Sequence, residues 1–377
     1  KLYTTISFIL NLYSFLCFIE SSTSNDDINQ KSCLVQSPQL CSIGLSVIIE
    51  ETKILGGSTM IKYFSMTNQQ LVNTQKETAE TVWYCVERPN EEEINTLTHQ
   101  FQIPSDYITS ILDDAENSRE EEFNQTKLTK PALLLLQYPF VKTSPSGYFQ
   151  MDTYPFSIIV TPQKKLITIT NHEPLFLKKV FSQTFEKNDL STNLNIFMQI
   201  IWQITFSYNT YLSTLQSQCD VLEKQLRVST ENSQLYQIMD IQKSLVYFRE
   251  ATAANSTTLN TLIKNKAIQE NHALRAHLHD VIIETEQART TARIQLNLVE
   301  QMNQTFSAII SNNLNNIMKI LTSLTIILTI PTIIGSLYGM NIKLPIAERD
   351  DAFLWLTLFM LLISILTAYY LKKGKFL

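Results

Sequence analysis

Three consecutive residues near the C-terminus, Gly339, Met340 and Asn341, carry the most specific chemistry in this sequence. The Asn341 carboxamide has a neutral oxygen that accepts hydrogen bonds from water, and Gly339 is expected to give the backbone the freedom that a helix end needs. A small divalent cation such as Mg²⁺ holds its hydration water tightly. A ring of such oxygens, with backbone carbonyls near Gly339, would bind the hydrated ion and release it again. An ordinary helix stop at lipid headgroups is the alternative interpretation.

Two uncharged segments flank this triplet. Residues 320–342 lie between Lys319 and Lys343, and residues 352–371 lie between Asp351 and Lys372. Each is long enough to cross a hydrocarbon core of ~30 Å as a helix. The short connection carries a net negative charge and the end of the chain is rich in lysine, so the positive-inside bias predicts that both ends of the chain are cytosolic.

The region before the first span is predicted to be helical, because residues 175–330 contain neither glycine nor proline. Apolar residues at alternating steps of three and four form one stripe from Leu212 to Leu226 and begin a second at Leu235. From about Thr257 the pattern predicts one unbroken helix that includes a cytosolic stalk and the first span. Only packing against partners would keep so long a helix in place.

Residues 80–172 alternate strand-like and helix-like segments and predict a compact α/β domain. The expected strands are 81–86, 132–136, 156–160 and 166–170, and the expected helices are 90–101 and 106–112. The acidic residues 113–122 are expected to form an exposed turn. The predicted organisation is a cytosolic α/β domain at 60–195, a helical bundle and stalk at 196–318, and a two-span pore domain at 319–377.

Composition excludes several classes of protein. A net charge of −5 leaves no basic stripe for nucleic acid. Five cysteines without C-x-x-C spacing are read as reduced, structural thiols. Between residues 58 and 334 the one glycine is Gly147, so a phosphate-binding glycine loop is absent. We find no catalytic arrangement of side chains and expect no enzymatic activity and no cofactor.

The first 59 residues have no clear place in this organisation. Residues 2–19 are uncharged and resemble a short signal-peptide core or a third span. A different hypothesis is that the natural protein starts at Met60 and that residues 1–59 are upstream leader, since Gly56 and Gly57 can be encoded by a purine-rich ribosome-binding site. The mass of the protein made from its own promoter would decide between these interpretations.

The order of these features resembles the CorA family of divalent-cation channels: a long helix free of glycine and proline, Met318 and Lys319 entering the membrane, Gly339-Met340-Asn341 leaving it, a short loop, a second span and a lysine-rich tail. The resemblance covers about residues 80–377. It implies an α/β cytosolic domain, a helical stalk continuous with the first span, and a homopentameric funnel around one pore. It also implies a selectivity filter formed by the triplet.

The same resemblance assigns further pore-lining residues. Asn315, Met318, Leu321 and Thr332 would face the axis, with Met318 and Leu321 as a hydrophobic constriction; lipid-facing or interhelical packing is the alternative for both. Acidic residues of the external loop could concentrate cations at the pore mouth, although ordinary solvated loop charges explain them equally well: Glu348, Asp350 and Asp351.

Regulation by cytosolic Mg²⁺ is a further property that the resemblance implies. The stalk aspartate of the family corresponds to Asp280, which a solvated helix charge would also explain. The partner segment of the family commonly has Glu-Asp where this sequence has Thr109 and Ser110. Asp106, Asp113 or Asp114 could supply the missing oxygen. We read His277 and His279 as surface residues, because positions two apart point to different sides of a helix.

The resulting hypothesis is a channel for Mg²⁺, with Co²⁺ or Ni²⁺ as possible further ions, in the cytoplasmic membrane of a bacterium. Its partners would be other copies of the chain, membrane lipids and divalent cations, and its Mg²⁺ would be both transported ion and regulatory ligand. A zinc transporter of the same superfamily is the nearest alternative, and Met340 favours magnesium. A membrane-anchored coiled-coil receptor or scaffold is less compatible, because the loop between the spans is too short for a sensor domain.

Overall fold

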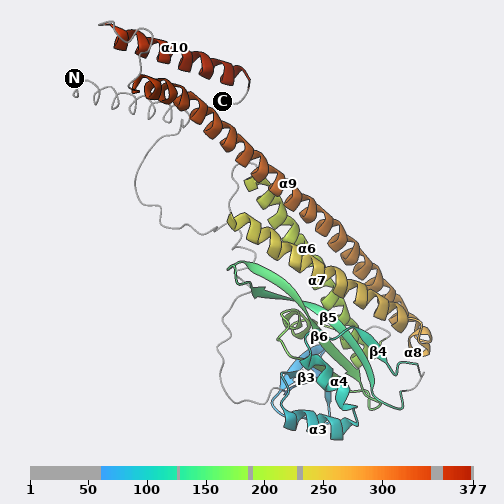
Figure 1. Cartoon of the computed structure of the whole chain (residues 1–377). Helices are drawn as coiled ribbons and strands as arrows, with labels where there is room; N and C mark the ends of the chain where they lie inside the picture. The colour runs from blue at the N-terminus through green and yellow to red at the C-terminus, as the bar shows by residue number, and fades with distance from the viewer. Residues whose placement is uncertain (1–60, 125–127, 186–189, 227–231, 341–350, 375–377) are drawn as a thin grey trace. The chain divides into compact units, whose positions relative to one another are not determined.

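The computed structural model describes residues 61–124, 128–185, 190–226, 232–340 and 351–374, and the side chain of Ala352 is not included. Its central element is a seven-stranded sheet with strand order β2-β1-β3-β7-β6-β5-β4 (Figure 1). β3 and β7 are parallel and all other neighbours are antiparallel. The strands are β1 Ile61–Thr67, β2 Gln70–Thr74, β3 Thr81–Glu87, β4 Arg119–Glu121, β5 Ala132–Thr143, β6 Phe149–Val160 and β7 Leu166–Thr170.

The helices divide between the two faces of this sheet and the long C-terminal region. Their bounds are α3 Glu91–Phe101, α4 Ser105–Thr109, the 3-10 helix η1 Ser110–Leu112, α5 Leu177–Phe181, α6 Thr192–Leu226, α7 Asn232–Leu262, α8 Lys266–Gln269, α9 His272–Tyr338 and α10 Ala352–Lys373. The α/β domain, the long helix and the apolar C-terminal helix are those expected from the sequence.

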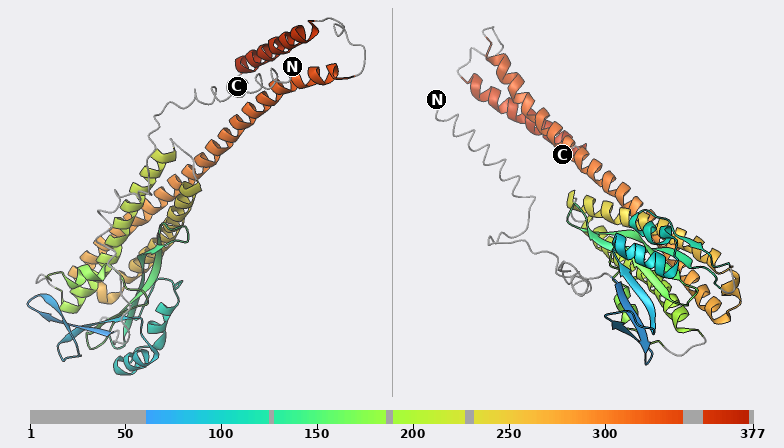
Figure 2. Two further views of the ribbon diagram at one scale, coloured as in Figure 1. Left: turned by 90° about the vertical axis from the view of Figure 1, so that its left-hand side faces the viewer. Right: turned by 90° about the horizontal axis from the view of Figure 1, so that it is seen from below.

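Both faces of the sheet are buried, and β5 shows this directly. Leu133 and Leu135 point into a core formed with α3, α4 and η1, whereas Leu134 and Leu136 point into the core formed with α6 and α7. Alternate residues of a strand face opposite sides of a sheet. The continuous leucine run of β5 is therefore a strand buried on both sides, and α6 and α7 lie on the face opposite α3 (Figure 2).

The predicted strands are confirmed, and two are longer than expected. β5 and β6 each have 12 residues and pair from Ala132–Val160 to Thr143–Phe149. The predicted turn at 113–122 is wrong in its last part, because Arg119–Glu121 pairs with Leu133–Leu135 as the edge strand β4. The β1–β2 hairpin was not expected from the sequence. Its turn uses Asn68 and Gln69 at φ 50° and 64°, without glycine.

A three-helix packing of α6, α7 and α9 follows the sheet. The stripe from Leu212 to Leu226 is buried in α6, apart from a half-buried Cys219. Consecutive residues of α9 hydrogen-bond to the other two helices: Asn209 Nδ2 donates to Glu284 Oε2 at 2.9 Å, the hydroxyls of Thr205 and Thr285 are 3.2 Å apart, and Ser256 donates to Glu286. Because these bonds need specific partners, they fix the rotation and height of α9 against α6 and α7.

The prediction of one unbroken helix from Thr257 is wrong. α7 ends at Leu262, the short α8 follows, and α9 begins only at His272. Asn271 is the N-cap of α9, and its side-chain oxygen accepts from the Leu274 N–H at 3.0 Å. Asparagine can end and restart helices in this way without glycine or proline. The unbroken part is nevertheless 67 residues long and includes both stalk and first span.

The proposed division into domains stays a prediction. Residues 1–59, which we expect to be upstream leader, lie outside the described residues, as does Met60.

Candidate functional site

The end of α9 and the whole of α10 are long and apolar enough to cross a membrane. α10 packs against this end of α9 (Figure 2). Large apolar side chains of both helices are nevertheless open in the single chain: Leu321 is 55% exposed, Ile333 54% and Phe353 78%. So much exposed apolar surface on neighbouring helices calls for lipid or further copies of the chain.

The predicted filter begins where α9 ends. Gly339 is the C-cap of α9, and its N–H donates to the carbonyl of Gly335 at 3.0 Å. Its φ is −83°, which any residue can adopt, and a Cβ there would meet backbone oxygens at 3.5 Å, an ordinary contact. The expected need for glycine flexibility at this position is therefore not supported. Met340 is 51% exposed, and Asn341 lies outside the described residues.

The four residues that the family resemblance assigns to the pore before the filter all lie on α9, and all are exposed in the single chain: Asn315, Met318, Leu321 and Thr332. At about 100° per residue, Met318 and Thr332 return to nearly the same side of the helix, with Leu321 within about one sixth of a turn of Met318. The residues that are buried or half-buried in this part of α9 follow another stripe: Lys319, Ser323, Ile327, Ile330, Pro331, Ile334 and Tyr338. That second stripe is roughly opposite the first, and we assign it to packing with α10.

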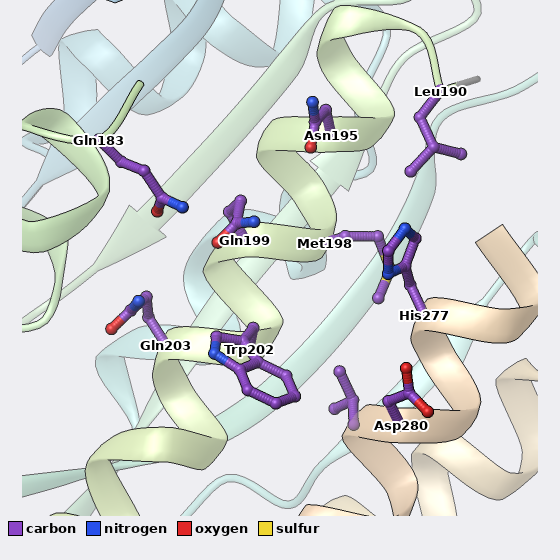
Figure 3. A pocket seen from close by; sticks show the side chains of 10 residues that line it. Gln183, Leu190, Asn195, Met198, Gln199, Trp202, Gln203, His277 and Asp280 are labelled. Carbon is purple, nitrogen blue, oxygen red and sulfur yellow. The ribbon is translucent and has the colours of Figure 1, made fainter. Parts of the chain in front are cut away.

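Asp280 lines a cavity between α6 and α9 that has both polar and apolar side chains in its wall (Figure 3). Its volume is about 320 Å³. The His277 ring of α9 lies beside Met198 of α6, and Asp280 lines the same cavity from the next turn of α9. Amide side chains of the same cavity add further oxygen atoms: Asn195, Gln199 and Gln203. Carboxylate and amide oxygens are ligands that Mg²⁺ prefers, but the described residues contain no cluster of three acidic, histidine or cysteine side chains.

The suggested partners of Asp280 lie elsewhere in the fold. Thr109 ends α4 and Ser110 begins η1, and both elements pack on the face of the sheet opposite α6 and α7. Asp106, Asp113 and Asp114 are exposed in or beside the same elements, and Asp114 contacts His172 at 3.1 Å. One chain therefore does not bring Asp280 together with this segment. His277 and His279 are both exposed, as expected.

The external-loop carboxylates are only partly described. Glu348 and Asp350 lie outside the described residues. Asp351 is exposed at the start of α10, where its backbone carbonyl accepts from the N–H groups of Leu354 and Trp355 at 3.1 and 3.2 Å. Because Asp351 is exposed, its carboxylate is accessible to solvent.

The two cysteines in the described part of the chain are free thiols. Burial raises the pKa of Cys85 to about 12 and that of Cys219 to about 11. Both thiols are therefore protonated at neutral pH, whereas a nucleophilic or metal-binding cysteine would have to be a thiolate. These two thiols are structural, in agreement with the sequence.

Comparison with known proteins gives the family. The family model described as "CorA-like Mg2+ transporter protein" matches residues 78–373, which include strands β3 to β7, the long helix α9 and the apolar helix α10. This chain belongs to that family. The cobalt/magnesium transport protein CorA of Methanocaldococcus jannaschii is 25% identical over 294 residues, 78% of this chain and 90% of that protein. The magnesium transport protein CorA of Helicobacter pylori is 21% identical over 319 residues, 79% and 91% of the two chains.

Solved structures show the same fold. The complete structure of the CorA magnesium transporter from Methanocaldococcus jannaschii superposes with a TM-score of 0.67 at 21% identity, covering 84% of this chain and 98% of that one. Full-length CmaX superposes with a TM-score of 0.54 at 13% identity, covering 85% and 99%. The CorA fold thus extends over sheet, stalk and spans in this chain.

Sequence reasoning missed one feature of the CorA-like first span. Besides Thr332, the exposed side of α9 carries Thr322, Thr325 and Thr329. The signal was present in the alternating steps of three and four between them, but a pattern of apolar residues was the one sought.

Proposed function

We propose that this protein is a channel that carries Mg²⁺, and with it Co²⁺ or Ni²⁺, inward across the cytoplasmic membrane of a bacterium. The observation that carries the proposal is that the CorA-like match continues through both spans to residue 373, with Gly339-Met340-Asn341 at the end of α9. The matched relatives named above are magnesium or cobalt/magnesium transport proteins. This favours magnesium over the zinc alternative and transport over a receptor or scaffold.

Several copies of the chain must form the pore, because two helices enclose no channel. We propose a homopentamer with α9 around the axis and α10 outside it, both chain ends in the cytosol, and lipid in contact with α10. Two observations support this arrangement: the side of α9 opposite its buried stripe is exposed, and α10 is open to its surroundings along its length. Tyr369 and Tyr370 before Lys372 and Lys373 fit a cytoplasmic membrane boundary.

Transport in this scheme needs no chemical step. The ring of Asn341 carboxamides, with carbonyls near Gly339, would bind the ion through its hydration water, and Met340 would lie beside it. Asp351, with Glu348 and Asp350, would raise the local concentration of cations at the mouth. The membrane potential supplies the driving force, since two charges moving through 100 mV gain ~4.6 kcal/mol.

The test is Mg²⁺ influx into proteoliposomes that contain the full chain, followed with an internal fluorescent indicator under an imposed inside-negative potential. We expect influx that depends on the potential and on the protein. Zn²⁺ influx driven by a pH gradient, without Mg²⁺ influx, would support the zinc transporter instead. Absence of flux for both ions, with the protein correctly inserted, would contradict the channel proposal.

We further propose that cytosolic Mg²⁺ closes the channel by binding at Asp280. Within one chain, Asp280 faces a cavity rich in oxygen ligands, while Thr109 and Ser110 lie on the other face of the sheet. A site joining Asp280 to that segment therefore requires two subunits. Because Thr109 and Ser110 replace acidic residues of the family pattern, the carboxylate of Asp280 carries most of the charge of this site.

Asp280→Asn is accordingly expected to leave the channel open at high internal Mg²⁺. The half-inhibitory Mg²⁺ concentration should rise at least about fivefold, the lower end of typical coupling between sites. Proteoliposomes loaded with graded Mg²⁺ measure this directly. Asp220→Asn, which changes an exposed aspartate of α6, is the control. Equal inhibition of wild type and Asp280→Asn would mean that Asp280 is an ordinary surface charge.

A further inference from the structure

Four threonines form a continuous stripe along the membrane-spanning part of α9. Thr322, Thr325, Thr329 and Thr332 follow one another at steps of three, four and three, and all four are exposed in the single chain. We call them the threonine track. At 1.5 Å per residue they cover ~15 Å, about half of a hydrocarbon core.

Each hydroxyl of the threonine track donates its hydrogen to the backbone carbonyl four residues earlier in α9. The Oγ1 atoms of Thr322 and Thr325 donate to the carbonyls of Met318 and Leu321 at 2.7 and 2.9 Å. Those of Thr329 and Thr332 donate in the same way to the carbonyls of Thr325 and Leu328 at 2.7 and 2.9 Å. A hydroxyl has one hydrogen and two acceptor lone pairs. The side of the track that faces away from the helix therefore presents hydrogen-bond acceptors and no donors.

The position of the threonine track on α9 indicates whether its hydroxyls would face lipid, α10 or the pore axis. The buried stripe that we assign to packing with α10 includes Ser323, which is 1% exposed, together with the half-buried Ile327, Ile330 and Ile334. At about 100° per residue the track lies roughly on the opposite side of the helix. In a ring with α10 outside, that side faces the axis. Met318 lies on the same side, one turn before Thr322.

The chemistry of the track matches a hydrated cation. Water bound to Mg²⁺ directs its oxygen at the ion, so the outer surface of the hydrated ion presents O–H donors. A hydrated anion presents the opposite arrangement. A row of acceptors on a narrow pore wall therefore stabilises the first kind of ion and not the second, and the absence of charge keeps binding weak enough for conduction.

We propose that the threonine track is a binding path for hydrated divalent cations, in which hydroxyls from each subunit accept hydrogen bonds from the hydration water between the filter and the Met318–Leu321 constriction. The inference rests on the proposed channel function and deepens it. It also confines the apolar part of the pore to the cytosolic end, because the track keeps the wall polar from Thr322 to Thr332.

Threonines of α10 show that back-bonded hydroxyls alone do not make such a path. Thr357 and Thr367 donate to the carbonyls of Phe353 and Ile363 at 2.8 and 2.9 Å, as the track residues do. They are half-buried and ten residues apart, so they form no row. Their hydroxyls serve the helix itself, and they provide a matched control.

The experiment compares two double variants of the full chain in proteoliposomes. Thr325→Val/Thr329→Val removes two hydroxyls per subunit at nearly constant volume, and Thr357→Val/Thr367→Val does the same on α10. One lost hydrogen bond corresponds to about a fivefold change in rate. The α9 variant loses two hydroxyls in every subunit, so we expect it to lose at least about tenfold in Mg²⁺ influx. The α10 variant should stay within about twofold of wild type. Thr325→Ser/Thr329→Ser should conduct, because it keeps the hydroxyls.

Three results would overturn the inference: wild-type influx in an intact Thr325→Val/Thr329→Val assembly, an equal loss in the α10 variant, or loss in the serine variant. Should the valine variant fail to assemble, Thr329→Cys decides the question. A water-soluble thiol reagent should block Mg²⁺ influx through Thr329→Cys and leave Thr357→Cys and the parent chain unaffected, and an unblocked Thr329→Cys would contradict the track. If wild-type protein itself carries no Mg²⁺, the channel proposal fails and the track fails with it.

Discussion

Replacing Asn341 with alanine is expected to abolish Mg²⁺ uptake while leaving the assembly intact. The substitution removes one neutral carboxamide from every subunit at the same level of the pore. Each hydrogen bond to hydration water contributes about 1 kcal/mol, and several are lost together, so we expect influx to fall at least about a hundredfold. Uptake into proteoliposomes measures the loss, and size-exclusion chromatography in detergent measures assembly.

The matched control for this change is Asn313→Ala. Asn313 is an exposed asparagine of α9 that precedes the first span, and it lies away from the side that carries Met318. It should conduct like wild type. Undiminished flux through an assembled Asn341→Ala channel would remove the filter from this residue. Asn341→Asp keeps the acceptor oxygens and adds a negative charge. Mg²⁺ should therefore still bind, but it should leave more slowly because the charge strengthens binding.

The α/β domain could be predicted from sequence to the extent that its strands are self-evident. The β-branched and aromatic segments 81–86 and 166–170 are strands in the structure, and they pair in parallel at the centre of the sheet. The β1–β2 hairpin was missed because its turn uses Asn68 and Gln69 in left-handed conformation rather than Asn-Gly. Its stability comes from pairing of β1 with β3, a contact between distant segments that no local pattern contains.

The helical region shows the same limit. Absence of glycine and proline correctly predicted helices from α6 to α9 but gave no sign of the breaks after Leu262 and before His272. There the chain must reverse direction so that α7 and α9 can pack, and the side chain of Asn271 caps the start of α9. Tertiary packing, rather than intrinsic propensity, sets these boundaries.

For the site, the pore assignment stays a prediction. Met318 and Thr332 lie on the side of α9 opposite the buried stripe that we assign to α10 packing, which is compatible with that assignment. The role of Thr325 and Thr329 depends on where their hydroxyl hydrogens go, which only side-chain positions show. In the same way, only the structure shows that Asp280 and Thr109 lie on opposite sides of the sheet.

The apolar constriction gives the last prediction. Met318 and Leu321 are 51% and 55% exposed, on the exposed side of α9 just before the threonine track. In a ring of subunits they would form an apolar collar at the cytosolic end of the pore. Such a collar blocks ions when it loses its water. In the proposed channel the track would keep the wall polar from Thr322 to Thr332, so closure would depend on this collar.

Met318→Asn/Leu321→Asn should therefore make the channel leak. Polar side chains keep the collar wet, so we expect Mg²⁺ influx to persist at internal Mg²⁺ concentrations that silence wild type. The influx should be at least about fivefold above the residual flux of wild type, because one hydrogen bond lowers the barrier by about 1 kcal/mol. Ile320→Asn, between the two positions in sequence but on another side of α9, controls for the polar substitution itself. A double variant that still closes would place the barrier elsewhere, and a leak through Ile320→Asn would show that destabilising the span suffices. Combined with Asp280→Asn, the leak should not increase further, because a regulatory site has no effect on a collar that no longer dries.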